Sequence, residues 1–282
     1  MTKQGTLYVV ATPIGNLGDI TLRAVEVLKS VDAIAAEDTR HTSGLLAHFG
    51  IQKKLIAVHE HNEQQSAQAL LAKLQAGEHI ALVTDAGTPG ISDPGAVVVK
   101  LLLEHHVNVV PIPGASALIA ALSVSGITAT GFQFVGFLPA SGAQRRKQLE
   151  VLSAQATTLV FYEAPHRIVD CIQDMANVLG GERMITIARE LTKTFETIHR
   201  CPLKDAPAWL AHDLNQQRGE FVLLVEQAPL VEVAAVSPDA EKTLRLLLAE
   251  LPLKQAVKLA VDITGAKKND LYELALTLKQ EP

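Results

Sequence analysis

Short apolar runs alternate with amphipathic segments over the first 125 residues. Runs such as Leu7–Ala11 and Ile80–Val83 have the length and composition of buried strands. Between them, apolar residues recur at helical spacing, as at Leu22, Val25 and Leu28. Strands separated by helices are typical of a parallel sheet with helices on its faces. The pattern therefore predicts an N-terminal α/β domain over residues 1–125.

The pattern changes near residue 126, where strands follow one another with shorter connections. The expected strands include Phe132–Pro139, Thr157–Tyr162, Thr194–Cys201 and Glu220–Gln227. Short connections favour antiparallel neighbours, because parallel strands need a crossover. We therefore expect a second α/β domain over residues 126–228 with a mixed or mostly antiparallel sheet.

The last part of the chain reads as a linker and a small helical tail. Residues 229–237 contain few helix signals, and residues 238–282 hold three helix-like patterns. Two of these, Leu253–Ile263 and Lys268–Leu276, flank Thr264-Gly265. This outline is that of a helix-turn-helix, although simple helical packing explains it equally well.

Glycine- and proline-rich loops follow the predicted strands of the first domain. Residues 83–95 hold three glycines, two prolines and two aspartates between a strand and a helix. Pro13-Ile14-Gly15 follows the first strand, and Ser116 begins a helix after another. Open α/β sheets bind ligands at the carboxyl ends of their strands. No G-x-G-x-x-G or G-x-x-x-x-G-K-[ST] motif occurs, so the loops indicate a small ligand with a nucleoside part rather than NAD specifically.

Polar residues also gather where strands end. The sets are Glu37, Asp38 and Arg40; His61 and Asn62; Glu163, His166 and Arg167; and Arg189, Glu190 and Lys193. Each set is open to two interpretations, a surface or interdomain ion pair and a contact with substrate. His59 and His61 share a face of an extended segment, but no third ligand has suitable spacing, so no metal is expected.

Composition narrows the classes of protein. The net charge of −5 argues against a broadly cationic nucleic-acid binder, although a local basic stripe such as Arg145-Arg146-Lys147 stays possible. Only Cys171 and Cys201 occur, without metal-binding spacing, which favours a reducing compartment. No apolar run approaches membrane-spanning length. We expect a soluble, cytoplasmic protein.

Six motifs together resemble the tetrapyrrole-methylase-type (class III) S-adenosylmethionine-dependent methyltransferases. They are Ala11–Asp19, Ala36–Arg40, Asp85–Gly95, Pro113–Ala117, Phe161–Arg167 and Arg189–Lys193. Within that superfamily the chain is similar to enzymes that methylate a cytidine ribose 2′-hydroxyl in small-subunit (16S) ribosomal RNA. The resemblance covers roughly residues 5 to 228. It implies two α/β domains with S-adenosylmethionine in the cleft between them, and a homodimer.

The resemblance also implies the residues that contact the cofactor, and the chemistry of the reaction predicts a base and RNA contacts. Cofactor contacts are expected from Pro13, Ile14, Gly15, Asp85, Ala86, Gly87, Thr88, Ser116, Ala117, Tyr162 and Ala188. A ribose hydroxyl is a poor nucleophile, so a base is expected among Glu163, His166, Glu37 and Asp38. RNA contacts are expected from Arg40, His61, Asn62, Arg145, Arg146, Lys147, Arg167, Arg189 and Lys193.

Three other functions stay open at this point. The same fold methylates ring carbons of tetrapyrroles, whose carboxylates also bind arginine. A dinucleotide-dependent oxidoreductase fits the acidic strand end at Glu37-Asp38 but lacks the glycine motif. A noncatalytic RNA-binding module using the helical tail is disfavoured by the acidic net charge.

Overall fold

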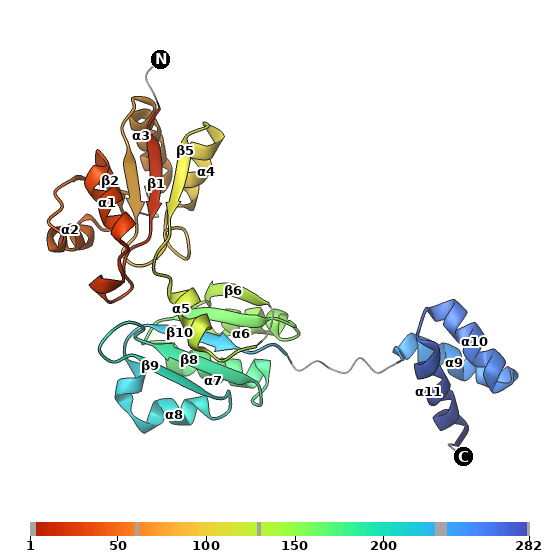
Figure 1. Ribbon diagram of the computed structural model, residues 1–282. Coiled ribbons are helices and arrows are strands. Elements are labelled where there is room, and N and C mark those ends of the chain that lie inside the picture. Colours follow the sequence, from red (N-terminus) through yellow and green to blue (C-terminus); the bar gives the residue numbers. More distant parts are fainter. Residues whose placement is uncertain (1–3, 60–61, 129–130, 229–235, 281–282) are drawn as a thin grey trace. The chain divides into compact units, whose positions relative to one another are not determined.

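The computed structural model describes residues 4–59, 62–128, 131–228 and 236–280. The chain divides into two compact units, Met1–Gln227 and Ala228–Pro282. The first unit contains two five-stranded sheets, and the second contains helices (Figure 1). The predicted fold class, two α/β domains followed by a small helical tail, is confirmed.

The first sheet is entirely parallel, with the strand order β3-β2-β4-β1-β5. Its strands are β1 (Thr6–Val10), β2 (Ala33–Ala36), β3 (Lys54–Ala57), β4 (Ile80–Val83) and β5 (Asn108–Ile112). β2 and β4 are buried at every position, because the sheet is covered on both faces. Their in-register pairing, Ala36 opposite Val83, brings the residues that follow both strands to one edge.

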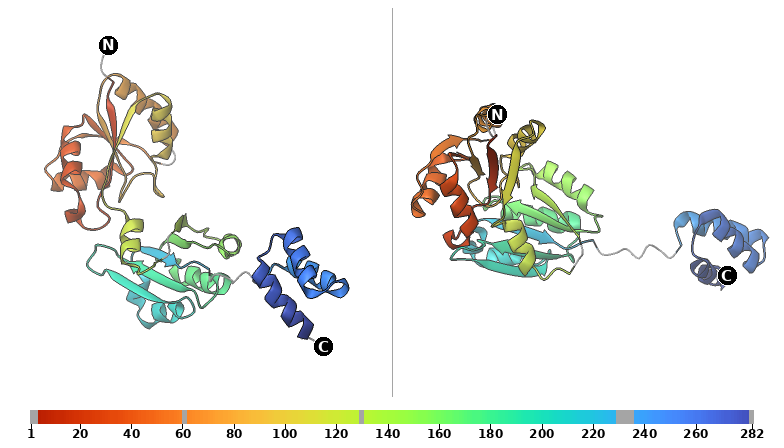
Figure 2. Two further views of the ribbon diagram at one scale, coloured as in Figure 1. Left: turned by 45° about the vertical axis from the view of Figure 1, so that its right-hand side comes forward. Right: turned by 45° about the horizontal axis from the view of Figure 1, so that its top comes forward.

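Helices cover both faces of this sheet (Figures 1 and 2). On one face, α1 (Leu22–Ser30) and α2 (Thr39–His48) supply Leu28 and Leu46 to a core with Ile34. On the other face lie α3 (Glu63–Gln75) and α4 (Ala96–Glu104). A short 3-10 helix, η1 (Leu17–Asp19), lies in the loop after β1.

The second sheet is mixed, with the order β6-β7-β10-β8-β9. β6 and β7 are parallel, and the other pairs are antiparallel. The strands are β6 (Phe132–Phe137), β7 (Thr158–Glu163), β8 (Met184–Arg189), β9 (Thr197–Pro202) and β10 (Phe221–Val225). One face packs on helices α6 (Gly142–Leu152), α7 (Ile168–Leu179) and α8 (Ala206–His212), and η2 (Leu214–Gln217) follows α8.

The opposite face of the second sheet contacts α5 (Ala117–Val124). Leu118 and Ala121 of this helix form one buried cluster with Val160, Ala188 and Leu224. The helix precedes residue 125 in the sequence, yet it packs on the second sheet. The chain therefore changes from one sheet to the other between β5 and α5, ahead of the change in sequence pattern.

The second unit consists of α9 (Pro238–Glu250), α10 (Leu253–Thr264) and α11 (Lys268–Gln280). Leu244, Val257 and Leu271 are buried in a core of its own. Gly265 ends α10 in the left-handed region at φ 70°, where glycine carries little steric cost. The expected linker largely falls outside the described residues, while Ser237 caps α9. Within the described segments, no helix combines the length and apolar character needed to cross a bilayer.

Candidate active site

The loop that follows β4 is fixed at three points. Its start is joined to the loop after β1, because the backbone N–H groups of Thr12 and Gly87 each donate to the other's carbonyl at 2.9 and 3.0 Å. Gly87 has φ 78°, so a side chain there would strain the backbone. Further along, the Thr88 hydroxyl donates to the Ala115 carbonyl at 3.1 Å. The two predicted glycine loops therefore form one rigid wall.

Glu63 fixes the far end of the same loop. Its Oε1 accepts hydrogen bonds from the backbone N–H groups of Gly95 at 2.8 Å and Val97 at 2.9 Å. A carboxylate at this position neutralises the exposed donors of the first turn of α4. Sequence reasoning did not identify Glu63, because it lies 32 residues from Gly95.

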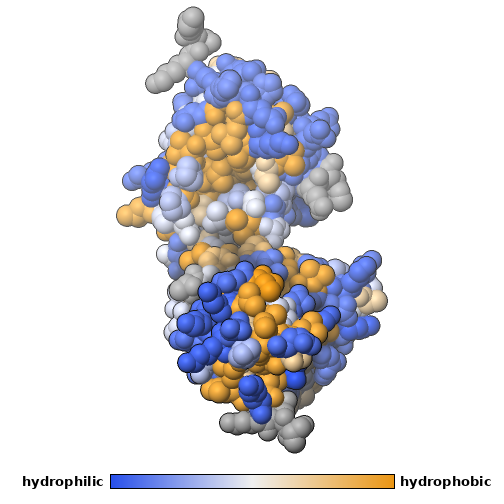
Figure 3. Space-filling model, turned by 90° about the vertical axis from the view of Figure 1, so that its right-hand side faces the viewer, coloured by the Kyte–Doolittle hydropathy of each residue, from blue (hydrophilic) through white to orange (hydrophobic). Residues whose placement is uncertain are grey.

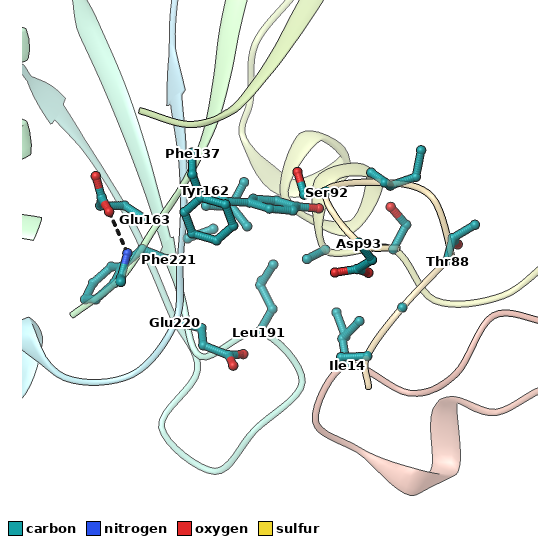
Figure 4. A pocket seen from close by; sticks show the side chains of 18 of the residues that line it. Ile14, Thr88, Ser92, Asp93, Phe137, Tyr162, Glu163, Leu191, Glu220 and Phe221 are labelled. Atoms are coloured by element: carbon teal, nitrogen blue, oxygen red, sulfur yellow. Dashed lines mark hydrogen bonds between the residues drawn. The ribbon is translucent and has the colours of Figure 1, made fainter. Parts of the chain in front are cut away.

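The loops of the first sheet and the ends of β7, β8 and β10 enclose a cavity of about 380 Å³ (Figure 4). This volume suits a small-molecule ligand. Eight residues predicted to contact the cofactor line it: Ile14, Ala86, Gly87, Thr88, Ser116, Ala117, Tyr162 and Ala188. Pro13, Gly15 and Asp85 are not among its lining residues.

Tyr162 holds the second-sheet wall against α5. Its hydroxyl accepts the Leu118 N–H at 3.2 Å, within the first turn of α5. Its ring meets those of Phe134 and Phe137 edge-on, with centroids 4.9 and 5.8 Å away. Burial raises the pKa of the Tyr162 hydroxyl, so it stays a neutral hydrogen-bonding group.

Asp93 presents a carboxylate to the cavity, opposite Tyr162 and beside Ile14 and Thr88 (Figure 4). Burial raises its pKa to about 6, and the negative charges of Glu37 and Asp85 add to the shift. In the part of the chain that the structure describes, no basic side chain forms an ion pair with this half-buried carboxylate. Such a site favours a positively charged ligand group.

The two acidic residues that follow β2, Glu37 and Asp38, have different environments. Glu37 faces Asp85, whose backbone N–H donates to it at 3.4 Å, and burial raises the pKa of Glu37. Asp38 instead forms an ion pair with Arg40 at 2.8 Å, which lowers the pKa of Asp38 to about 2. Asp38 also accepts the Arg40 backbone N–H and so caps α2. Asp38 is therefore a surface and capping residue, unsuited to accepting a proton.

Glu163 lines the cavity, but its carboxylate is held by neighbouring groups. Its side chain is fully buried, contacts the Arg167 guanidinium at 3.1 Å, and accepts the Ala164 N–H at 2.8 Å. Its carboxylate turns away from Asp93 (Figure 4). Arg167 also donates to the Leu138 carbonyl. The pair holds the end of β7, while His166 is exposed and does not line the cavity.

Several arginines expected to bind RNA have structural contacts instead. Arg145 is buried and donates to Asp174 at 2.7 Å. Arg189 is buried and donates to the carbonyls of Arg218 and Phe195 at 3.1 and 3.0 Å. Burial takes both guanidinium groups away from a macromolecular surface, which argues against the predicted RNA contacts.

The other predicted RNA contacts are partly accessible. Arg40 is 91% exposed, whereas Arg146 shares Asp174 with Arg145 from an exposed position on α6 beside the exposed Lys147. Helix α6 covers the face of the second sheet opposite α5, and the cavity lies on the α5 face. Lys193 bridges Glu190 and Glu220 at 2.9 and 2.8 Å.

The two residues predicted after β3 have different outcomes. Asn62 closes a local turn, because its Oδ1 accepts the His59 N–H at 2.8 Å and its amide donates to the Ala57 carbonyl at 3.3 Å. His61 lies outside the described residues. The turn explains Asn62 without a ligand.

Sequence reasoning missed half of the cavity wall. The additional lining residues are Ile91, Ser92, Asp93, Phe137, Ala164, Pro165, Leu191, Glu220, Phe221 and Val222, besides Glu163. Asp93 lies within the glycine-rich loop 83–95, but no feature of the local sequence indicates that its side chain is partly buried. Glu220 directly precedes β10, and Val222 lies within it. The position of β10 in the middle of the second sheet follows only from the strand order.

Comparison with known proteins bears directly on this site. The profile of a family described as Tetrapyrrole (Corrin/Porphyrin) Methylases matches residues 6–207. The chain belongs to the tetrapyrrole methylase family. A second profile, described as RsmI C-terminal HTH domain, matches residues 234–279, which cover most of the helical unit.

Two curated relatives of this tetrapyrrole methylase match almost its whole length. A protein of Escherichia coli O157:H7 named "Ribosomal RNA small subunit methyltransferase I" is 54% identical over 274 residues, 97% of this chain and 96% of that protein. The protein of the same name from Pseudomonas aeruginosa is 53% identical, over 96% of this chain and 97% of that one.

A solved structure shares the fold. Uroporphyrin-III C-methyl transferase from Thermus thermophilus, complexed with S-adenyl homocysteine, aligns with a TM-score of 0.56 and 20% identity. The alignment covers 79% of this chain and 98% of that one. At this identity the likeness concerns the fold, so it does not favour a tetrapyrrole substrate.

Proposed function

We propose that this protein transfers a methyl group from S-adenosylmethionine to a cytidine ribose 2′-hydroxyl in the RNA of the small ribosomal subunit, in the cytoplasm. The observation that carries the proposal is the match, along nearly the whole chain, to relatives named ribosomal RNA small subunit methyltransferase I. The cavity described above supports it, because it offers one compact site where two sheets meet.

The residues around the cavity fit the methyl donor. S-adenosylmethionine supplies an electrophilic methyl group on a sulfonium and carries a second positive charge on its amino group. The half-buried Asp93 carboxylate, with a pKa raised to about 6, gains stability from a cation beside it. Backbone at Ala86–Thr88 offers hydrogen-bonding groups, and the apolar side chains of Ile14 and Leu191 exclude water.

Methyl transfer to oxygen is an in-line displacement, in which the new C–O bond forms as the C–S bond breaks. Alignment of the two reacting atoms therefore supplies most of the acceleration. The rigid wall made by the Thr12–Gly87 pairing and the Thr88–Ala115 bond provides that alignment on the donor side. The ribose hydroxyl must also lose its proton as the bond forms.

Glu37 and His166 are the proposed proton acceptors. Burial raises the pKa of Glu37 above its ordinary value, which improves a carboxylate as a general base. Glu163 and Asp38 are already committed to Arg167 and Arg40. We expect Glu37→Gln or His166→Ala to lower kcat and to leave the dissociation constant of S-adenosylmethionine unchanged.

RNA recognition is proposed to use exposed cations around unit Met1–Gln227. Arg40 lies at the carboxyl end of β2, the edge that also carries Glu37, and Arg146 and Lys147 lie on α6. Contacts of this kind act on phosphates and weaken with salt. Replacing Arg40 or Lys147 by alanine is expected to raise KM for RNA without affecting cofactor binding.

Two measurements test the proposed function. Calorimetry with the purified protein tests uptake of S-adenosylmethionine, and a ribose-methylation map of ribosomal RNA from cells with and without the gene tests the substrate. We expect binding and the loss of one 2′-O-methyl cytidine from small-subunit RNA. No uptake of the cofactor, or an unchanged map, contradicts the proposal.

A homodimer is also proposed. An apolar groove runs between α4 and the edge strand β5 and includes Val99, Leu103 and Val109. Figure 3 shows hydrophobic surface gathered on this side of the first sheet. Exposed apolar patches and open strand edges favour association. We expect Leu103→Lys to shift the mass in light scattering from dimer to monomer, whereas Val151→Lys, at a residue 73% exposed on α6, leaves it unchanged.

A further inference from the structure

The hairpin between β8 and β9 borders the cavity and displays an aromatic ring to solvent. We define residues 190–196 as the rim hairpin. Leu191 projects into the cavity, and Glu220, which accepts from Lys193 at 2.8 Å, also lines it (Figure 4). Close to the start of β9, Phe195 is 70% exposed. Phe195 is therefore an exposed ring on the same short hairpin as Leu191, four residues away along the chain, which lines the cavity.

The backbone that carries this ring is firmly held. The buried Arg189 guanidinium donates to the Phe195 carbonyl at 3.0 Å, and the Thr197 hydroxyl donates to the same oxygen at 3.1 Å. In the described part of the chain, the hydrogen bonds of Arg189 go to backbone and hydroxyl oxygens rather than to a carboxylate. The buried Arg189 guanidinium therefore fixes the backbone that carries Phe195.

The hairpin is also strained. Glu190 and Thr192 adopt positive φ angles of 52° and 66°, a region that is unfavourable for a β-branched residue such as threonine. The Thr192 N–H donates to Glu196 at 2.6 Å, which helps to hold the strained turn. Strained backbone persists where the surroundings enforce it, and it concentrates at functional sites.

The rim hairpin touches the first-domain loop that borders the same cavity. A Cβ on Gly15 would lie 2.5 Å from Lys193 Cγ, so the two loops are in close contact. The hairpin therefore reaches from one wall of the cavity to the other. Phe195 lies two residues beyond Lys193, outside this contact.

We propose that the Phe195 ring stacks on a base of the substrate RNA and positions the target nucleotide over the cavity. This inference rests on the proposed function. A ribose buried in a stacked RNA must be exposed before it can react, and aromatic side chains commonly replace the lost stacking. The neighbours of Phe195 in the rim hairpin, Thr194 and Glu196, are polar and exposed, so Phe195 is the exposed apolar side chain of this hairpin.

Steady-state methyl transfer to purified small ribosomal subunits tests the proposal with Phe195→Ala, Phe195→Leu and Phe195→Trp. Stacking on one base is worth about 5- to 150-fold in affinity. We expect the alanine and leucine variants to raise KM for the subunit by about tenfold or more, and Phe195→Trp to stay within about threefold of wild type. Val151→Ala, at an equally exposed apolar residue on the far helix layer, serves as the control.

Two further readouts separate the outcomes. The dissociation constant of S-adenosylmethionine and the oligomeric mass are expected to stay unchanged in all Phe195 variants. A leucine variant as active as wild type overturns the stacking role, and a change in mass assigns the ring to contact between copies of the chain. An inactive wild type overturns the proposed function and this inference together, whereas an active wild type matched by Phe195→Ala overturns only the inference.

Discussion

Replacing Asp93 by asparagine should stabilise the unliganded protein and weaken its binding of the methyl donor. The carboxylate is half buried and its pKa rises from 3.8 to about 6. Each unit corresponds to about 1.4 kcal/mol, so the shift sets an upper limit of about 3 kcal/mol. Because the group is only half buried, solvent screening reduces this to about 1–2 kcal/mol. Asparagine removes the charge while it keeps the shape.

The pH dependence has a definite sign. Between pH 3.8 and about 6 the folded protein retains the Asp93 proton that the unfolded chain has lost. Wild-type stability therefore falls as the pH rises through this window, and the advantage of Asp93→Asn grows over the same window and is complete above about pH 6. Urea titrations at pH 4 and pH 7 measure the free energy of unfolding of the wild type and of Asp93→Asn.

The same substitution is expected to weaken cofactor binding while it stabilises the unliganded protein. A charge-assisted contact is worth about 1.5–3 kcal/mol, so Asp93→Asn should raise the dissociation constant of S-adenosylmethionine about 10- to 100-fold. Asp38→Asn is the matched control, because Asp38 is a partly exposed carboxylate whose pKa is lowered to about 2 by Arg40. It should give no stabilisation and unchanged cofactor affinity. An Asp93→Asn protein that is less stable at pH 7, or that binds the cofactor as wild type does, refutes the reasoning.

Four other predictions follow from described contacts. Affinity for S-adenosylmethionine should fall as the pH drops below about 6, with proton release on binding near that pH in calorimetry, because protonation removes the Asp93 charge. Glu163→Gln should lower the free energy of unfolding by about 1–3 kcal/mol in urea titrations, since the Arg167 partner is left without a counterion, while His166→Ala should leave it unchanged. Gly87→Ala should lower the free energy of unfolding by about 1–2 kcal/mol and weaken cofactor binding, because an alanine at φ 78° strains the turn paired with Thr12. The control is Gly50→Ala, at a surface turn with φ 65°. It should lower the free energy of unfolding by a similar amount without affecting cofactor affinity. A chain ending at Gln227 should fold and bind the cofactor as the full chain does in calorimetry, since the helical unit has its own core; a loss of binding would contradict this.

The arrangement of elements was largely readable from the sequence, because strands and helices leave local periodic patterns. The apolar run Ile80–Val83 predicted a buried strand, and β4 occupies those residues in the middle of the first sheet. The glycine loops after β1 and β4 predicted a ligand edge, and Ile14, Gly87 and Tyr162 line one cavity. The resemblance to a methyltransferase family supplied the cofactor, which composition and spacing did not.

Only the tertiary structure decided which polar residues face the cavity and which support the fold. Arg145 looked like part of a basic stripe, but folding brings Asp174 to it across 29 residues and buries both. Asp93 and Asp38 are both loop carboxylates in the sequence, yet burial raises the pKa of one and Arg40 lowers that of the other. Side-chain periodicity is a local property of the chain, whereas burial and ion pairing depend on partners that the chain meets only after it has folded.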